Sequence, residues 1–214
     1  MSRAIALQEK FGNRYPRESC GIGIVHLGIG AFHRAHQAWY TEKLLSQHPG
    51  NWSISGISLR SPNVRDQLAP QDGFYTLMEN DRSGQRMEVI GVVREVLCAP
   101  ESPAAVLNRL CQPETKIASL TVTEKGYCHD PATGRLNHKN PQVIADLENT
   151  NKPSSALGYL CEALYQRWRQ DLGPFTIISC DNLPSNGKVL RGLLIEFAKL
   201  RDAELADWIE NHVS

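Results

Sequence analysis

The chain has 214 residues, of which 41% are hydrophobic and 21% charged, and its formal net charge at pH 7 is zero. These values are typical of a globular protein with its own core, and a neutral chain lacks the basic excess that favours nucleic acids or anionic membranes. No apolar run approaches the ~20 residues needed to span a bilayer. We therefore expect neither a nucleic-acid nor a membrane partner.

The first segment, "MSRAIALQEKFGNRYPRES", is mixed polar and has no apolar core of the kind found in signal peptides. The six cysteines are scattered without a C-x-x-C pair, which is typical of reduced thiols rather than a disulfide framework. We expect a cytoplasmic protein in which residues 1–20 are an N-terminal extension and residues 21–214 form one domain.

Strand-like and helix-like segments alternate from residue 21 onward, which predicts an α/β fold with a doubly wound, mostly parallel sheet. A β-hairpin with a Ser83-Gly84 turn interrupts this alternation. In chain order we expect a strand at 21–28, a helix at 34–48, a strand at 51–60, the hairpin at 74–93, a helix at 102–111, a strand at 116–127, helices at 141–149 and 156–170, a strand at 174–180, and helices at 188–201 and 203–213.

Gly28 and Gly30 lie between the first expected strand and the first expected helix. Glycines in this place permit a tight turn and let a pyrophosphate approach the backbone, but His33 takes the third glycine position of the usual fingerprint. The motif by itself leaves a nucleotide-binding turn and a plain tight turn as alternatives. His33 and His36 could share a helix face as metal ligands, but no third ligand is evident and we predict no metal site.

Polar residues follow three of the expected strands, in the segments "GIGAFHR", "TVTEKGY" and "CDNLPSNG". Parallel strands end at the same edge of a sheet, which is where ligands bind in open α/β folds. Taken alone, Asp181 or Asn182 could simply cap the following helix. The three segments together favour a binding edge.

At these same residues, "IVHLGIGAFHRAHQ", "LTVTEKGYC" and "SCDNLPSNG", the chain resembles the long-chain mannitol dehydrogenase family, which includes mannitol 2-dehydrogenases, arabinitol dehydrogenases and mannonate oxidoreductases. The resemblance runs from about Ile22 to the last residue. It implies that residues 21–214 form a Rossmann-type, dinucleotide-binding domain that works without zinc. It also implies hydride transfer between the secondary alcohol of a polyol or sugar acid and NAD, with NADP as the alternative cofactor.

The resemblance also implies roles for individual residues. Asn182 matches an asparagine that polarises the substrate oxygen, where an amide donor would stabilise alkoxide-like charge. The implied cofactor-binding residues are Gly28, Gly30, Ala31 and Phe32 at the pyrophosphate turn, Arg60 and Ser61 beside the adenosine ribose, and Thr123 and Glu124 near the nicotinamide.

The sequence departs from the family in two places. Pro62 and Asn63 stand where NAD-preferring members can carry carboxylates, which leaves Arg60 and Arg65 as partners for a 2′-phosphate. The family's general base is a lysine of a Lys-x-x-x-x-Asn-x-x-His pattern in a helical C-terminal domain, and these 214 residues contain no such pattern. We therefore expect the cofactor half of a two-domain enzyme, which binds a dinucleotide and turns over polyol poorly or not at all.

Two other interpretations remain beside an active oxidoreductase. One is a nucleotide-binding module without catalysis, and the other is an α/β scaffold without a ligand, in which the polar strand exits are only helix caps. If the helical domain is absent, apolar surface is left uncovered and promotes self-association. Trp208 and Ile209 are then expected to be exposed or buried in a homo-oligomer.

Overall fold

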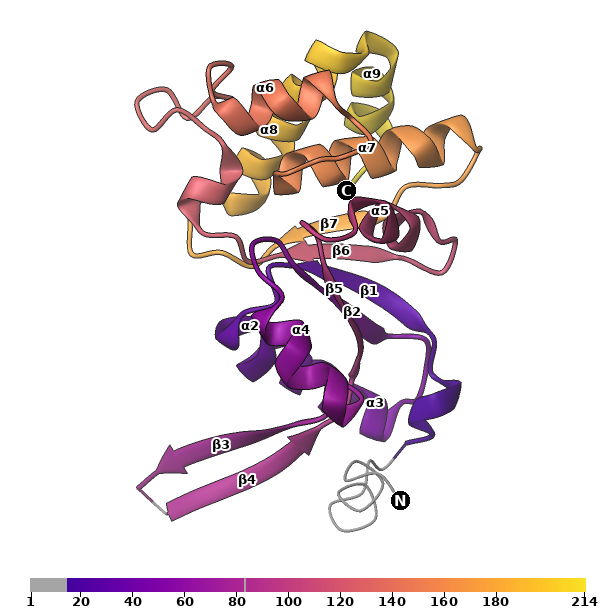
Figure 1. Cartoon of the computed structure of the whole chain (residues 1–214), viewed down its shortest axis with the longest axis vertical. Coiled ribbons are helices and arrows are strands. Elements are labelled where there is room, and N and C mark those ends of the chain that lie inside the picture. Colours follow the sequence, from indigo (N-terminus) through magenta and orange to yellow (C-terminus); the bar gives the residue numbers. More distant parts are fainter. Residues whose placement is uncertain (1–14, 83) are drawn as a thin grey trace.

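The computed structural model describes residues 15–82 and 84–214, which form a parallel five-stranded sheet with helices on both faces (Figure 1). The strand order is β5-β2-β1-β6-β7. This arrangement confirms the predicted doubly wound α/β fold. The strands are β1 (Ile22–Leu27), β2 (Ser53–Ser58), β5 (Val93–Cys98), β6 (Ile117–Leu120) and β7 (Thr176–Ser179).

Strand β1 lies at the centre of the sheet, between β2 and β6. The chain first winds outward from β1 through β2 to β5, and then returns to place β6 on the other side of β1. The direction of winding therefore reverses beside β1. In open α/β sheets, ligands bind outside the carboxyl ends of the strands at this kind of reversal.

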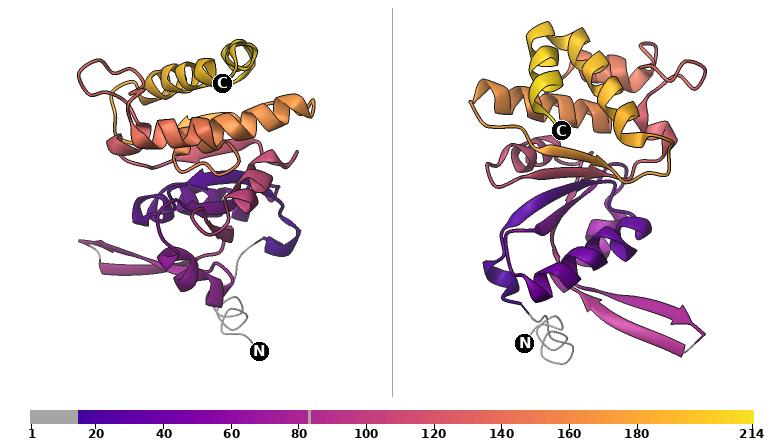
Figure 2. Two further views of the ribbon diagram at one scale, coloured as in Figure 1. Left: turned by 45° about the horizontal axis from the view of Figure 1, so that its top comes forward. Right: turned by 180° about the vertical axis from the view of Figure 1, so that it is seen from behind.

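Helices cover both sides of the sheet, and the views in Figure 2 agree on this separation. One face carries α2 (Ala31–Ala35), α3 (Gln37–Gln47) and α4 (Asn63–Leu68). The other face carries α5 (Pro103–Cys111), α6 (Pro141–Glu148), α7 (Ala156–Arg169), α8 (Asn186–Arg201) and α9 (Ala203–His212). Short 3-10 turns are η1 (Arg17–Ser19), η2 (Ala69–Gln71) and η3 (Glu124–Tyr127). No helix among the described residues is long and apolar enough to cross a membrane.

The predicted hairpin is present as β3 (Tyr75–Asp81) and β4 (Gly84–Ile90), which project from the body as a separate antiparallel ribbon (Figure 1). Asp81 pairs with Gly84, and Ser83 of the expected turn lies outside the described residues. The base of the ribbon is attached to α3, because Trp39 Nε1 donates to Glu88 Oε2 at 2.9 Å and Lys43 forms an ion pair with the same carboxylate.

The structure corrects the expected helix at 34–48 and adds two elements. Helix α2 begins earlier, directly after Gly30, and His36 interrupts the helical path because its backbone leaves the helical region (φ −116°, ψ −83°). Strand β5 and helix α4 were not predicted. The β5 sequence, "VREVLC", mixes charged and apolar residues and follows the hairpin without a clear turn, so its pattern did not separate it from the hairpin.

Residues 15–20 contact the domain in the structure. The Tyr15 hydroxyl donates to Glu42 at 2.9 Å, and the buried Arg17 guanidinium donates to the carbonyls of Gly91, Asp72 and Val93. Burial of a charged group is tolerated when its donors are satisfied in this way. The division of the chain at residue 20 stays a prediction.

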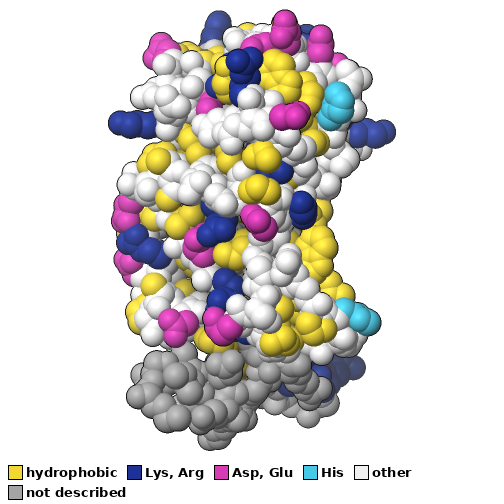
Figure 3. Space-filling model, turned by 90° about the vertical axis from the view of Figure 1, so that its right-hand side faces the viewer, with side chains coloured by type: hydrophobic (Ala, Val, Ile, Leu, Met, Phe, Trp, Pro, Cys, Tyr) yellow, Lys and Arg dark blue, Asp and Glu magenta, His cyan; other side chains and the backbone are white. Residues whose placement is uncertain are grey.

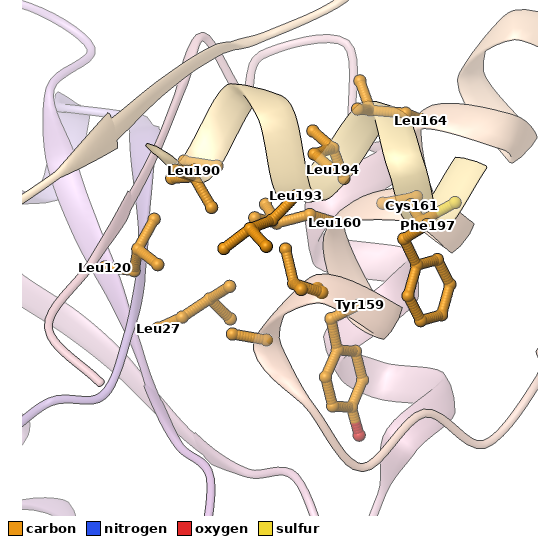
Figure 4. Close-up of a cluster of buried hydrophobic side chains, with 14 of the residues drawn as sticks. Leu27, Leu120, Tyr159, Leu160, Cys161, Leu164, Leu190, Leu193, Leu194 and Phe197 are labelled. Carbon is orange, nitrogen blue, oxygen red and sulfur yellow. The ribbon is translucent and has the colours of Figure 1, made fainter. Parts of the chain in front are cut away.

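The larger core cluster joins α7 and α8 to the sheet, as Figure 4 shows. Leu27 and Leu120 point from β1 and β6 toward leucines of both helices. The expectation for the C-terminal helix is corrected at Ile209, which is 1% exposed and belongs to this core, while Trp208 is half-buried. Ile209 is therefore covered by the chain's own helices and needs no second copy.

Charges of both signs are interspersed with hydrophobic side chains on the side of the molecule shown in Figure 3, as a net charge of zero allows. The cysteines behave as free thiols. All six are unpaired, and burial raises the pKa of Cys111 and Cys128 to about 11 and that of Cys161 to about 12. These thiols are therefore protonated near neutral pH.

Two leucines of α8 test the assignment of the core. Leu193 is 2% exposed and packs toward the sheet, whereas Leu200 of the same helix is 46% exposed. We expect Leu193→Ala to lower the free energy of unfolding by ~2–5 kcal/mol, because it leaves a cavity. Leu200→Ala should change it by less than ~0.5 kcal/mol. Urea unfolding followed by circular dichroism measures both, and equal effects would contradict this packing.

Candidate functional site

A cleft of about 360 Å³ opens at the carboxyl ends of β2, β1 and β6, where the winding direction reverses. Four of the residues implied by the resemblance line it, namely Gly28, Gly30, Arg60 and Thr123. Three strand exits thus meet at one edge of the sheet. The complete lining is Gly28, Ile29, Gly30, Ser58, Leu59, Arg60, Thr121, Val122, Thr123, Lys125, Gly126, Gln142, Ser154, Ser155 and Ala156.

Gly28 must be a glycine for reasons internal to the fold. Its φ of +96° is a conformation that side chains disfavour, and a Cβ there would overlap the carbonyl oxygen of Thr121. The turn is held to β2, because the Gly28 and Ile29 amides donate to the Ile57 carbonyl at 2.8 and 3.1 Å. Gly28 therefore lets the exits of β1 and β6 lie directly against each other.

Gly30 has no such internal reason. Its φ of −94° suits any residue, and a Cβ there would have only the Gly28 carbonyl oxygen nearby, at an ordinary 3.7 Å. Because Gly30 lines the cleft, a side chain would instead occupy the space that a ligand enters. The missing Cβ thus leaves the backbone open to close approach, as a diphosphate requires.

The charges of the lining complement an anion. Arg60 and Lys125 line the cleft, and none of the described residues that line it is Asp or Glu. Arg65, the other expected partner for a 2′-phosphate, is already paired with the carboxylates of Asp66 and Glu101. Of the two arginines expected there, Arg60 is the one that faces the cleft.

A buried polar network supports the glycine turn from beneath. His26 of β1 has Nδ1 at 2.8 Å from Ser119 Oγ and Nε2 at 2.9 Å from Thr121 Oγ1. The Thr121 hydroxyl in turn lies 2.9 Å from the Gly28 carbonyl oxygen, and the Ser119 hydroxyl lies 2.9 Å from the Gln37 side-chain oxygen. These contacts join the turn after β1, the exit of β6 and the start of α3.

His33, at the third glycine position of the usual fingerprint, packs on this network. Its ring stacks on that of His26 with centroids 3.5 Å apart, and its Nδ1 lies 3.1 Å from Gln37 Oε1. Its Nε2 is buried without a partner among the described residues. Burial lowers the pKa of His33 to about 4 and also lowers that of His26, so both rings are neutral near pH 7.

His33 and His36 therefore do not form a pair of ligands, since His33 is 1% exposed and His36 is exposed to solvent. Across the described part of the chain, no group of three or more His, Cys, Asp or Glu side chains could hold a metal ion.

The exit of β6 carries a strained backbone. Thr123 has φ +64° and ψ +165°, a combination that costs ~1–3 kcal/mol outside glycine and persists only where neighbours impose it. The neighbour here is Asp181, whose carboxylate accepts the Val122 and Thr123 amides at 2.9 and 3.0 Å. Asp181 therefore does not cap the following helix. Helix α8 begins after Ser185, whose side chain makes no capping hydrogen bond.

The other implied residues lie beside the cleft and do not line it. Ala31 is exposed at the first position of α2, and Phe32 is 57% exposed and stacks on His36 at 4.2 Å. The Ser61 carbonyl accepts from the Ser58 hydroxyl at 2.5 Å. This bond folds the segment after β2 back onto the end of that strand.

At the opposite end, Glu124 is exposed and lies 3.7 Å from His129. Asn182 is exposed, and no hydrogen bond joins its side chain to another described residue. The roles that the resemblance implies for the nine residues stay predictions, because they depend on ligands.

One wall of the cleft was not expected from the sequence. Gln142, Ser154, Ser155 and Ala156 face it from the segment around α6 and the start of α7. The buried Asp146 carboxylate accepts the amides and hydroxyls of both serines at 2.5–3.0 Å and holds this wall in place. A helix was predicted at 156–170 from the spacing of its apolar residues, but nothing in the sequence indicated that the segment before it lines a cleft.

Comparison with known proteins gives consistent matches. A family model described as the mannitol dehydrogenase Rossmann domain matches residues 22–214. The uncharacterized oxidoreductase YeiQ of Escherichia coli is 46% identical, over 94% of this chain and 42% of the relative. The D-mannonate oxidoreductase of Escherichia coli is 44% identical, over 89% of this chain and 40% of the relative.

A solved structure is also similar. The mannitol 2-dehydrogenase of Pseudomonas fluorescens, in a ternary complex with NAD and D-mannitol, superposes with a TM-score of 0.90 and 44% identity, over 94% of this chain and 42% of that chain. The chain thus spans about two fifths of the length of the relatives it matches.

The two glycines of the turn should differ in their effect on stability. Gly28→Ala forces a side chain into a left-handed conformation and against Thr121, so we expect a loss of more than ~1 kcal/mol in the free energy of unfolding. Gly30→Ala should be neutral or slightly stabilising, since its conformation and surroundings accept a Cβ. Urea unfolding of both variants measures the difference, and a Gly30→Ala loss as large as that of Gly28→Ala would contradict it.

The buried His33 should make stability fall in acid. Its pKa is about 4 in the folded chain and about 6.5 when unfolded. At pH values between these two, the unfolded state therefore carries more of the proton than the folded state. Stability is therefore lost as the pH falls from about 6.5 to about 4, by up to ~3 kcal/mol from this group. His33→Phe keeps an aromatic ring on His26 and should reduce that slope. Urea unfolding at several pH values tests this, and an unchanged slope would contradict it.

Proposed function

The chain belongs to the mannitol dehydrogenase family, as its Rossmann domain, and we propose that it binds NAD in the cleft at the carboxyl ends of β1, β2 and β6. The observation that carries the proposal is Gly30, which faces the cleft. Neither its backbone conformation nor its packing requires a glycine at this position. An approaching diphosphate accounts for it.

The residues present fit a dinucleotide along the whole cleft. The backbone at Gly28 and Gly30 would hold the diphosphate, with Lys125 supplying positive charge. In Rossmann folds the residues after the second strand read the ribose of the adenosine, which gives this role to Arg60 and Ser61. Thr123 and Glu124, at the exit of β6, would lie at the nicotinamide end. The nicotinamide supplies the site that accepts or releases a hydride.

We propose NAD rather than NADP as the preferred cofactor, supported by the NAD bound in the similar mannitol 2-dehydrogenase. The alternative has one specific observation in its favour. Arg60 faces the cleft, and no carboxylate there would repel a 2′-phosphate. Parallel titrations with NADH and NADPH decide between the two cofactors. Tighter binding of NADPH would indicate that Arg60 contacts a 2′-phosphate, and tighter binding of NADH would indicate that it lies beside an unmodified ribose.

The reaction we propose for the family member is oxidation or reduction at a secondary alcohol of a polyol or sugar acid. Support comes from the relatives, which include a D-mannonate oxidoreductase and a mannitol 2-dehydrogenase with D-mannitol bound. Asn182 follows β7 at the same sheet edge and is exposed, so its amide is free to donate to a substrate oxygen. An amide donor there would stabilise the negative charge that develops on that oxygen.

A second candidate is nucleotide binding without turnover. The pattern Lys-x-x-x-x-Asn-x-x-His, which carries the general base in the family that the sequence resembles, does not occur in these 214 residues. General-base assistance is typically worth ~10²–10⁴ in rate. We therefore expect the 214-residue chain alone to bind NADH and to oxidise mannitol or mannonate at most feebly. Turnover detected by NADH absorbance would contradict this expectation and favour the active enzyme.

The cytoplasmic location and the self-association expected from the sequence stay predictions. Cell fractionation addresses the first. Light scattering of the purified chain addresses the second, and a clean monomer would contradict it.

Gly30→Ala tests the proposed site directly. We expect it to weaken NADH binding by at least ~10-fold, because its Cβ would stand where the diphosphate meets the backbone. Calorimetric titration measures the affinity. Gly192→Ala is the matched control, because Gly192 lies on α8 with open space around it, and it should leave the affinity unchanged. Equal affinity of Gly30→Ala and the unaltered chain would place the ligand elsewhere.

A further inference from the structure

The carboxylate of Asp181 makes an unusual set of contacts at one end of the cleft. It accepts the amides of Val122 and Thr123 at 2.9 and 3.0 Å, and the hydroxyl of Tyr127 at 2.9 Å. Tyr127 is buried, and its hydroxyl also lies 2.5 Å from Ser179 Oγ. One side chain at the exit of β7 thus anchors the backbone at the exit of β6.

The segment it holds would not keep this shape unaided. Thr123 has φ +64°, in the region that favours glycine, and both Val122 and Thr123 line the cleft. Each amide donates a charge-assisted hydrogen bond to the carboxylate, and these two bonds offset the free-energy cost of the strained backbone. Without the carboxylate, the amides would lose their acceptor and Thr123 could relax to an ordinary conformation.

The backbone of Asp181 is fixed as well. The side chain of Asn186, at the start of α8, donates to the carbonyls of Ser179 and Asp181 at 3.1 and 2.9 Å. Asn182 follows directly in the chain. The position of Asp181 therefore sets the spacing between the cleft wall at Thr123 and the residue that we propose to contact substrate.

We propose that Asp181 is a positioning residue that shapes the nicotinamide end of the cleft. It does not line the cleft itself and acts through the backbone of Val122 and Thr123. The proposal rests on the proposed function, because it assigns that end of the cleft to the nicotinamide. It makes a specific claim, namely that loss of the carboxylate harms recognition of the nicotinamide part and spares the ADP-ribose part.

Two ligands and three variants test this claim by calorimetric titration of the full chain. The ligands are NADH and ADP-ribose, which lacks only the nicotinamide. Asp181→Asn has the same shape but replaces one acceptor oxygen with a donor that faces an amide N–H. Tyr127→Phe keeps the carboxylate and removes one of its donors. Glu196→Gln is the control, because Glu196 of α8 accepts the Leu136 amide and pairs with Arg135, and none of these residues lines the cleft.

We expect Asp181→Asn to bind NADH ~10-fold more weakly and ADP-ribose within about twofold of the unaltered chain. Tyr127→Phe should show the same split with a smaller loss, and Glu196→Gln should change neither affinity. Unchanged NADH affinity, or equal losses for both ligands, would overturn the proposal.

Circular dichroism and thermal melting of each variant separate a local effect from unfolding. If Asp181→Asn does not fold, Tyr127→Phe carries the test, and equal affinity of that variant and the unaltered chain for NADH would overturn the proposal. If the unaltered chain binds neither NADH nor ADP-ribose, the proposed function fails and this inference fails with it. If it binds both, only the behaviour of the variants decides the role of Asp181.

Discussion

The close approach of two backbones, at Gly28 after β1 and Thr121 after β6, is the constraint on which the cleft depends. A Cβ at Gly28 would overlap the Thr121 carbonyl oxygen, so only glycine allows the two strand exits to meet. Because β1 lies between β2 and β6, this contact forms where the winding of the sheet reverses. Moving either exit outward would separate the glycine turn from the opposite wall and open the cleft.

Polar side chains stabilise the ends of the strands that this close approach of two backbones brings together. His26, Ser119 and Thr121 tie the turn to β6 from beneath, Asp181 holds the strained Thr123 from β7, and Asp146 holds the two serines of the opposite wall. Loops need such support, because their backbone amides and carbonyls have no regular partners. Thus side chains that do not line the cleft, among them His26, Asp146 and Asp181, make many of the hydrogen bonds that fix its shape.

Several parts of the site could be predicted from the sequence, and others could not. Gly28 and Gly30 were identified because a strand, two glycines and a helix follow one another within a short segment. The same reasoning left a helix cap as the alternative role for Asp181 or Asn182, since Asp and Asn before a helix often have that role, and it did not foresee that the Asp181 carboxylate accepts the Val122 and Thr123 amides. It missed the Ser154–Ser155 wall, because Asp146 and the cleft are brought to those serines only by packing of α6 and α7.

By itself, the sequence determined the doubly wound sheet, the hairpin, most helices and the family, because these follow from local periodicity and from motifs in continuous segments. Only the tertiary structure decided which polar residues face the cleft and which support it. It separated Gly28, a glycine for conformational reasons, from Gly30, whose conformation and surroundings would accept a side chain. It also buried His33 on His26 and turned Asp181 toward Thr123. Such contacts join residues from different strands, and their distances depend on how the whole sheet and its helices pack.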